Sequence, residues 1–286
     1  MQQIGWSSRT RALAMAVAPV TVAITLGIIP VLVLFAESIV WAASPDLSAM
    51  LSAYIRLEES VYLAILGRSV LIGVVLTGAC LGVAYPVTYW LAHRCPPHRR
   101  VVLLVLLTLP LWLNYVVLNY VWVWILARGG LVNHLLSVVS PSMAPWALLY
   151  TELSLTVGFL YIYLPYVILA LYVAMERLDG ALLAAAADLG ATRWRLVTDV
   201  IIPQTVAGAA AGALIVYARI AGAFATPEIL GGPQQQLIAQ LITDAFLEVL
   251  DLRFAAALAF SFLAVVMFIL VIGLTSQQIR REVRKW

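Results

Sequence analysis

Long runs without a charged residue dominate this sequence and set its class of fold. A membrane-spanning α-helix needs about 20 mostly apolar residues. Charge-free runs of that length are Ala12–Ala36, Ser69–Ala92, Val101–Ala127, Leu153–Met175 and Phe254–Ile279. A sixth run, Val200–Pro227, contains one charge, Arg219, and we place its helix at 204–227. The sequence therefore predicts an all-α integral membrane protein with about six transmembrane helices.

The composition agrees with a chain surrounded by lipid. Only 11% of the residues are charged and 64% are hydrophobic, whereas soluble domains carry about 25% charged and 45–50% apolar residues. This excludes a water-soluble globular enzyme, and a net charge of +3 is too small to indicate nucleic-acid binding. Cys80 lies in an apolar run and Cys95 in a basic loop, so we expect neither a disulfide nor a metal site. We expect one transmembrane domain over residues 1–286.

The distribution of basic residues predicts the orientation, because Lys and Arg are enriched in short cytoplasmic loops. With the N-terminus inside, twelve of the seventeen basic residues fall on the inner side: Arg9, Arg11, Arg94, Arg99, Arg100, Arg177, Arg193, Arg195, Arg280, Arg281, Arg284 and Lys285. The outer segments mix basic with acidic residues: Arg56, Arg68, Arg128, Arg253, Asp46, Glu58, Glu59, Glu152, Glu228, Asp244, Glu248 and Asp251. Both termini are therefore expected in the cytoplasm. Tryptophans are expected to anchor the membrane interfaces: Trp6, Trp41, Trp146 and Trp286.

The inner loop 176–203 is long and carries the signals of two short helices. Asp179 is placed to cap a helix through Gly180–Leu189, and Gly190 is placed to end it. Thr192 is placed to cap a second helix through Arg193–Val200, before Pro203. Physical reasoning leaves two interpretations open for this loop: it docks against another protein surface, or it lies on the lipid headgroups.

Four segments resemble one known family. Leu182–Ala191 followed by Ile201–Pro203 resembles the EAA loop of bacterial ABC-importer permeases. The resemblance continues in Gly222–Gly232, in Pro110–Trp112 and in Tyr161–Pro165. Together these segments are similar to the spermidine/putrescine-type branch of the family, which also includes importers of opines and related organic ions.

The resemblance implies a type I ABC-importer permease fold in the bacterial inner membrane, with a cytoplasmic coupling helix. The implied partners are a second homologous permease subunit, a cytoplasmic ABC ATPase dimer that binds ATP and Mg, and an extracytoplasmic solute-binding protein. This chain is expected to be non-catalytic and without a cofactor, and its sequence has no G-x-x-x-x-G-K-[ST] phosphate loop. The residues expected to couple to the ATPase are Ala184, Ala185, Asp188, Gly190, Arg193, Arg195 and Pro203.

The sequence departs from the family pattern at two places. Ala184 stands where the loop usually has glutamate, so we expect Asp188, Arg193 and Arg195 to carry the docking instead. In the third span, Asn119 stands where relatives commonly have arginine, and Arg219 appears where relatives often have proline.

Arg219 is the one charge inside a predicted span. An arginine near a helix centre costs about 2.5–3.5 kcal/mol on insertion scales, so it is expected to face protein or water. It either lines the translocation pathway or a gate and attracts an anionic group of the solute, or it forms a structural tie to a carbonyl, to Glu228 or to a partner subunit. Both interpretations stay open.

Further polar residues are candidates for the pathway: Asn114, Tyr115, Asn119, Tyr120 and Glu228. The alternative for the Asn and Tyr set is hydrogen bonding between helices, worth about 0.6 kcal/mol for each bond, and the alternative for Glu228 is an ordinary charge at a span end. Small residues of the fifth span suit close packing of helices: Gly208, Gly212 and Gly222.

The outer segment Gln234–Asp251 has an amphipathic pattern. Its apolar stripe is Ile238, Leu241, Ile242, Ala245 and Val249, and its polar line is Gln236, Gln240, Asp244 and Glu248. We expect the polar line to be solvated, and a contact with the binding protein is the alternative.

The spans offer aromatic rings and one arginine but no carboxylate away from their ends. This weighs against a polycation and favours an anionic or zwitterionic organic solute, within a family that the resemblance links to polyamines. The alternative function is a stand-alone secondary transporter or channel subunit, which needs intramembrane acid or histidine relays that the sequence lacks. An intramembrane enzyme needs a catalytic constellation at depth, and the sequence shows none.

Overall fold

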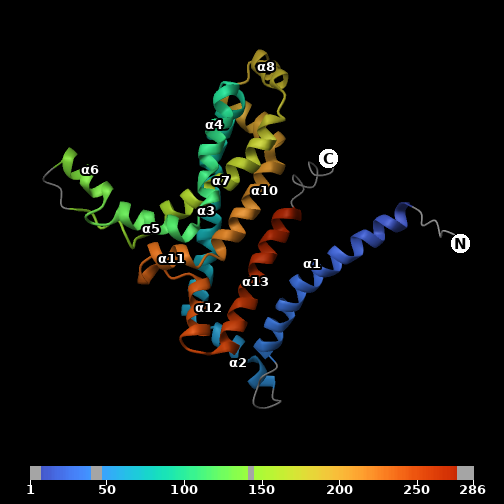
Figure 1. Ribbon diagram of the computed structural model, residues 1–286, viewed down its shortest axis with the longest axis vertical. Coiled ribbons are helices and arrows are strands. Elements are labelled where there is room, and N and C mark those ends of the chain that lie inside the picture. Colours follow the sequence, from blue (N-terminus) through green and yellow to red (C-terminus); the bar gives the residue numbers. More distant parts are fainter. Residues whose placement is uncertain (1–7, 40–46, 141–144, 276–286) are drawn as a thin grey trace, which may run out of the picture. The chain divides into compact units, whose positions relative to one another are not determined.

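The computed structural model describes residues 8–39, 47–140 and 145–275, and the regular elements in these ranges are all helices (Figure 1). In chain order they are α1 (Ser8–Ile39), α2 (Leu47–Leu57), α3 (Ser60–His93), α4 (Pro97–Thr108), η1 (Leu109–Trp112), α5 (Tyr115–Leu126), α6 (Leu131–Val139), α7 (Glu152–Glu176), α8 (Gly180–Asp188), α9 (Arg193–Arg195), η2 (Leu196–Ile201), α10 (Ile202–Ala221), α11 (Ala225–Leu230), η3 (Pro233–Gln235), α12 (Ile238–Leu247) and α13 (Leu252–Thr275). Some predictions fall outside the described residues: the roles of Trp6, Trp41, Asp46, Trp286, Arg280, Arg281, Arg284 and Lys285, and the last residues of the span 254–279.

The chain divides into two compact units, and the smaller one combines Met1–Ser60 with Ile242–Leu263. Within it, α1 packs on α13 through the rings of Phe35 and Phe260, whose centroids lie 4.8 Å apart. Arg56 of α2 lies 4.2 Å from the ring centroid of Phe254 and forms an ion pair of 3.1 Å with Asp251. These contacts hold the end of α2 against the beginning of α13.

The larger unit, Val61–Leu241 with Ala264–Trp286, is organised around α7. Phe159, Val167 and Leu171 of this helix are fully buried. A Cβ atom added at Gly208 of α10 would meet the Ala174 Cβ of α7 at 2.6 Å, and one at Gly212 would meet the Ala170 Cβ at 3.2 Å. The predicted packing role is therefore confirmed for both glycines, because only small residues let the two helices approach this closely.

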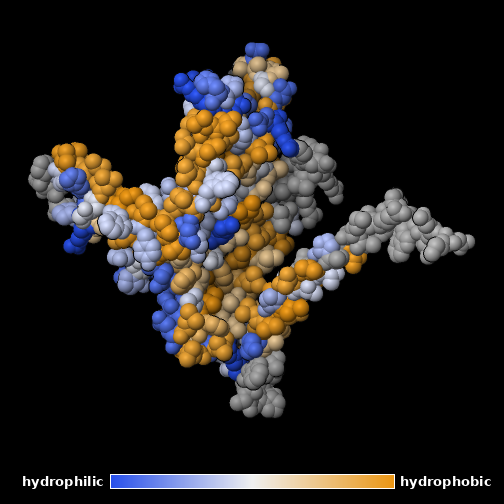
Figure 2. All heavy atoms as spheres, viewed as in Figure 1, coloured by the Kyte–Doolittle hydropathy of each residue, from blue (hydrophilic) through white to orange (hydrophobic). Residues whose placement is uncertain are grey.

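Five helical segments in the described ranges are long and apolar enough to cross a membrane: Ser60–His93, Tyr115–Val139, Glu152–Glu176, Arg193–Ala221 and Leu252–Gly273. The first predicted span falls in α1, where Ile24–Ile39 forms a shorter apolar helix. In the larger unit, hydrophobic surface covers the shaft of α4, and hydrophilic surface gathers at the end where α8 and the start of α4 lie (Figure 2). The prediction of an all-helical membrane protein is therefore confirmed.

The stretch 101–127, predicted as one span, is instead three helices. Pro110 lies in the 3₁₀ turn η1, and a proline removes a backbone donor and clashes with the preceding turn of an α-helix. The chain then extends at Leu113, and Asn114 caps α5 by accepting a hydrogen bond from the Val116 N–H at 2.8 Å. A proline and a new cap thus break the helix where hydropathy alone predicts continuity.

Two other helix bounds differ from prediction for physical reasons. α3 begins at Ser60 rather than at residue 69, and it includes Arg68, whose guanidinium is paired with Glu152 and with the backbone carbonyl of Gln234. The fifth span starts earlier than residue 204, because α9, η2 and α10 follow one another without a break. It ends at Ala221 instead of residue 227, so Arg219 lies in the last helical turn and not near the helix centre.

The outer segment forms η3 and α12, but its polar line is not uniformly solvated. Gln240 is buried: its Nε2 donates to Glu228 Oε2 at 2.7 Å, and its Oε1 accepts from the Leu237 N–H at 3.0 Å. The backbone N–H of Ile238 donates to Ser69 Oγ of α3 at 2.8 Å. The prediction for Gln240 is wrong because its buried amide bonds to Glu228 of α11 and to the backbone N–H of Leu237 just before α12.

Candidate functional site

Residues 176–203, which we call the elbow, connect α7 to α10 in the larger unit. The helix α8 starts as predicted: Asp179 Oδ1 accepts a hydrogen bond from the Ala181 N–H at 2.8 Å. Such a cap satisfies one of the free donors of the first turn.

The turn after α8 also follows the predicted signals. Gly190 has a φ of 79°, in the left-handed region. Its N–H donates to the Ala187 carbonyl at 2.9 Å, and the N–H of Ala191 donates to the Ala186 carbonyl at 3.1 Å. This pair of bonds is the Schellman motif, in which glycine avoids the steric cost of a Cβ atom.

The second half of the elbow is capped by Thr192, whose Oγ1 accepts a hydrogen bond from the Arg195 N–H at 3.3 Å. The helix continues through the π-helix η2 into α10. Pro203, the second residue of α10, has no N–H to donate, which accounts for an irregular hydrogen-bond ladder at this point. Both predicted caps are therefore confirmed.

The elbow presents its predicted coupling residues to the surface. All seven of them are exposed: Ala184, Ala185, Asp188, Gly190, Arg193, Arg195 and Pro203. The two most exposed large apolar side chains of the elbow are Leu189 at 89% and Trp194 at 75%. Small side chains beside exposed apolar ones form a surface that is typical of a contact with another protein or with lipid.

The base of the elbow is tied to the turn between α3 and α4. Arg100 donates to the Ala92 carbonyl at 2.8 Å, and its Nη1 lies 3.9 Å from the Glu176 carboxylate. Tyr172 donates to the same carboxylate at 3.0 Å. Glu176, at the base of the elbow, is therefore linked through Arg100 to the end of α3 and the start of α4.

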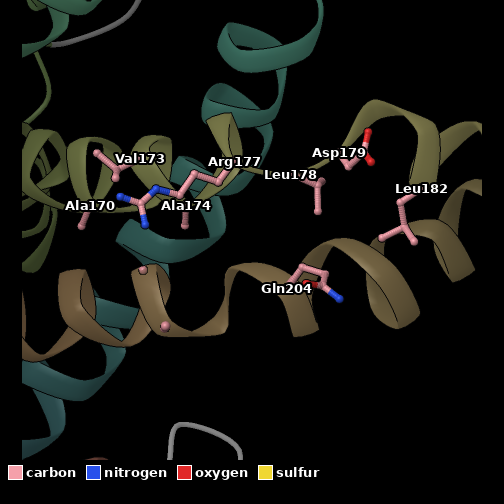
Figure 3. Close-up of a pocket in the computed structure, with 10 residues that line it drawn as sticks. Ala170, Val173, Ala174, Arg177, Leu178, Asp179, Leu182 and Gln204 are labelled. Carbon is pink, nitrogen blue, oxygen red and sulfur yellow. The ribbon is translucent and has the colours of Figure 1, made fainter. Parts of the chain in front are cut away.

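A cavity of about 550 Å³ lies between the elbow and α10 (Figure 3). Leu178 and Leu182 extend from the elbow toward the side of the cavity where Gln204 lies. Arg177 and Asp179 of the elbow also line the cavity, and the other lining residues come from the end of α7 and from α10: Ala170, Val173, Ala174, Ala207 and Gly208. The elbow is thus not packed solidly against the helices behind it.

A second cavity, of about 520 Å³, lies at the helix break between η1 and α5. We call it the tyrosine cavity, because Tyr115, Tyr163 and Tyr166 line it. Its remaining lining residues are Pro110, Leu111, Leu113, Asn114, Ile162, Ala218, Arg219, Gly222, Ala223, Phe224, Ala225 and Thr226. The ends of α5, α10 and α11 therefore meet at this cavity.

Arg219 reaches the tyrosine cavity from the last turn of α10. Its guanidinium carbon lies 4.7 Å from the ring centroid of Tyr166. The tie to Glu228 that the sequence left open is not present, because the Glu228 carboxylate accepts from Gln240 instead. Among the described side chains, no ion pair neutralises Arg219.

Asn119 takes the packing role rather than facing the cavity. It is fully buried, and its Nδ2 donates to the Tyr115 carbonyl at 2.9 Å and to Thr226 Oγ1 of α11 at 3.1 Å. A Cβ atom added at Gly158 of α7 would overlap Leu230 Cδ1 and would approach Thr226 Cγ2 at 3.3 Å. Asn119, Gly158 and Thr226 thus bring α5, α7 and α11 together in what we call the three-helix node.

The structure gathers three of the predicted pathway residues in the tyrosine cavity, namely Asn114, Tyr115 and Arg219. Tyr120 and Glu228 do not line it. Sequence reasoning missed Tyr163, Tyr166 and Thr226 as cavity residues, and it assigned Gly222 to packing although an added Cβ atom there would meet only the Ala218 carbonyl, at 3.5 Å. The signal was present in the family-like segments Tyr161–Pro165 and Gly222–Gly232, which hold Tyr163, Gly222 and Thr226.

Comparison with known proteins agrees with this architecture. The family described as "Binding-protein-dependent transport system inner membrane component" matches residues 4–281. The chain belongs to this family. It is therefore a permease subunit of an ABC importer in the inner membrane, and the family resemblance seen in the sequence is confirmed.

Two relatives of this permease carry the name spermidine/putrescine transport system permease protein PotB. The protein from Salmonella typhimurium (strain SL1344) is 33% identical over 222 residues, which cover 78% of this chain and 77% of the relative. The protein from Escherichia coli (strain K12) is 35% identical over 208 residues, which cover 72% and 75%. In sequence, this permease is therefore similar to members of the spermidine/putrescine branch.

The fold of this permease matches that of a solved bacterial alginate ABC transporter, crystallised in complex with a periplasmic protein that holds an alginate pentasaccharide. The TM-score is 0.70, the identity is 18%, and the match covers 93% of each chain. The helical arrangement is therefore that of an ABC-transporter permease.

Proposed function

We propose that this permease forms one half of a translocation pathway and is driven through its elbow by a cytoplasmic ABC ATPase dimer. ATP and Mg are bound and hydrolysed on that partner, a second homologous permease completes the pathway, and an extracytoplasmic binding protein delivers the solute. The solute is a small organic ion.

The observation that carries this proposal is the construction of the elbow. Caps at Asp179 and Thr192 and the turn at Gly190 fix its shape, while its small residues and the apolar side chains of Leu189 and Trp194 stay exposed. A pre-shaped apolar surface loses little conformational entropy when a partner covers it. This favours docking over a loop lying on headgroups.

The attachment of the elbow to Arg100 of α4 through Glu176 supports transmission of force. Closure of the ATPase dimer moves the elbow, and the elbow moves α7 and α10 together because Gly208 and Gly212 keep these helices in close contact. Such rigid-body movement of packed helices is the usual means of alternating access.

The experiment uses the full chain co-expressed with the ATPase and second permease encoded beside it. In the double variant Asp188→Ala with Arg193→Ala, we expect less ATPase to co-purify and uptake into proteoliposomes to fall, because the charged contacts of the elbow are removed. Arg99→Ala is the matched control, since Arg99 is an exposed arginine outside the elbow. Unchanged co-purification and uptake in the double variant would contradict the assigned docking residues. If no ATPase co-purifies with the wild-type chain, the proposed function is contradicted.

A further inference from the structure

The tyrosine cavity lies where a membrane helix is interrupted. η1 ends at Trp112, and α5 begins at Tyr115 after its cap, Asn114. Interrupted helices expose backbone groups at membrane depth, and such backbone is tolerated where it lines a cavity or is buried in protein. In transporters, the N-terminal ends of such half-helices carry partial positive charge and face anionic groups of the solute.

The charge in this cavity is positive. Arg219 lines it, and the cap residue Asn114 of α5 lines the same cavity. The lining contains no Asp or Glu, and Glu228, which follows in α11, is held by Gln240 at 2.7 Å. A dication entering here meets like charge, whereas a carboxylate meets an unneutralised guanidinium.

The rings of the cavity hold the arginine without neutralising it. A cation over an aromatic face gains about 0.5–1 kcal/mol at an exposed site, and the Tyr166 ring supplies this contact at 4.7 Å. Arg219 also lies at the C-terminal end of α10, where a cation interacts favourably with the helix dipole. Both contacts stabilise the positive charge without using the N–H donors of the guanidinium. These donors therefore stay available for a carboxylate, which a guanidinium binds well.

We propose that the tyrosine cavity is a transient subsite for the carboxylate group of the transported solute, with Arg219 as its anion-binding residue. The solute class is then a small organic anion or zwitterion rather than a polycation. This inference rests on the proposed function and names the chemistry of the pathway. The cavity volume of about 520 Å³ is sufficient for a small organic molecule. The tyrosines contact the carbon chain and offer hydroxyl groups for hydrogen bonding.

The test uses three probes with the same four-carbon chain: succinate, 4-aminobutyrate and putrescine. The detergent-purified complex of both permeases with the ATPase, without the binding protein, is heated with each probe at millimolar concentration. Omitting the binding protein ensures that any shift of Tm reports on the membrane subunits or the ATPase. We expect succinate and 4-aminobutyrate to raise the Tm and putrescine to leave it unchanged.

The variants Arg219→Ala and Arg219→Gln assign the shift to the cavity. We expect the apparent Kd for succinate to rise about tenfold or more in both variants, because a hydrogen bond to a charged group is lost. Arg99→Ala is the matched control and is expected to respond like the wild type. Arg219→Gln keeps a long polar side chain, so that at least one uncharged variant assembles.

Three outcomes contradict the inference. The first is that putrescine stabilises the wild-type complex more than succinate does, and the second is that no probe stabilises it. The third is that succinate binds the assembled Arg219 variants as well as it binds the wild type. In each of these cases the ATPase still co-purifies, so the proposed function stands. A wild-type chain that brings down no ATPase overturns the proposed function and this inference with it.

Discussion

The elbow and the three-helix node differ in the sequence distance that their contacts bridge. Between Asp179 and Arg195, the capping and turn bonds join residues close in sequence, such as Ala191 to Ala186. The node instead joins Asn119 to Thr226, which lie 107 positions apart. Beside it, Ser154 Oγ of α7 donates a hydrogen bond of 2.8 Å to the Leu230 carbonyl of α11, 76 positions away.

The two regions also differ in burial. Asn119, Ser154 and Leu230 are fully buried, whereas the coupling residues of the elbow are exposed. A region with local bonds and an exposed face keeps its shape while a partner binds or leaves it. A region with buried long-range bonds moves as a unit with its neighbours. Under the proposed function, the comparison assigns two tasks: the locally folded surface of the elbow receives force from the ATPase, and the cross-linked interior transmits it.

The largest effect is expected for Gly158→Val in the node. The added side chain would overlap Leu230 Cδ1 and press on Thr226, and overpacking of this kind costs about 1–3 kcal/mol. The Tm of the full chain in detergent should fall, and α11 should loosen. Gly82→Val on α3 is the matched control, since an added Cβ atom there meets nothing within 4 Å. Equal Tm values for the two variants would show that the node is not tightly packed.

The next effect is expected for Gly190→Val in the elbow. A left-handed φ costs a residue with a side chain about 1–2 kcal/mol, so the docking-competent shape should be populated about 5–30 times less. Because the elbow is locally folded, the Tm of the chain should hardly change while ATP-driven uptake falls. Gly190→Asn should be milder, since asparagine tolerates this conformation, and Gly180→Ala should be neutral. A large loss of Tm in Gly190→Val would mean that the elbow and the interior fold as one.

The smallest effect is expected for the hydrogen bond between Asn119 and Thr226. A double-mutant cycle with Asn119→Leu and Thr226→Val should give a coupling free energy of about 0.6 kcal/mol, the average for such bonds between membrane helices. The measurement is the free energy of unfolding of the four proteins in detergent micelles. Additive single effects would indicate that Asn119 stabilises the node only through its contact with its own helix.

The elbow was predictable from the sequence because capping and turn residues within the segment determine its structure. Asp179, Gly190 and Thr192 act on atoms within five residues of themselves. For the same reason α7, which is capped by Thr151 and carries charges only at its two end residues, differs from its predicted span by a single residue at each end. Where a segment contains the residues that begin and end its helix, its bounds can be predicted without knowing which other helices it contacts.

The tyrosine cavity was only partly predictable, because long-range packing decides which polar residues face it. Asn119 and Tyr115 share a helix face in the sequence pattern, but Asn119 turns to Thr226, a residue of α11. The interruption at Pro110 and the early end of α10 at Ala221 place Asn114 and Arg219 beside the same cavity. Hydropathy averages over such breaks. It predicted about six spans, whereas five helical segments of the described residues are long and apolar enough to cross a membrane, and it did not locate the point where helix ends meet.

Amide hydrogen exchange is the most direct test of the elbow as the surface that receives force. It is measured on the full chain purified alone in detergent and on the same chain in complex with the ATPase. The account predicts that the ATPase slows exchange across Ala181–Arg195 and leaves exchange in α11 unchanged. Exchange across Ala181–Arg195 that stays equally fast with and without the ATPase would contradict it.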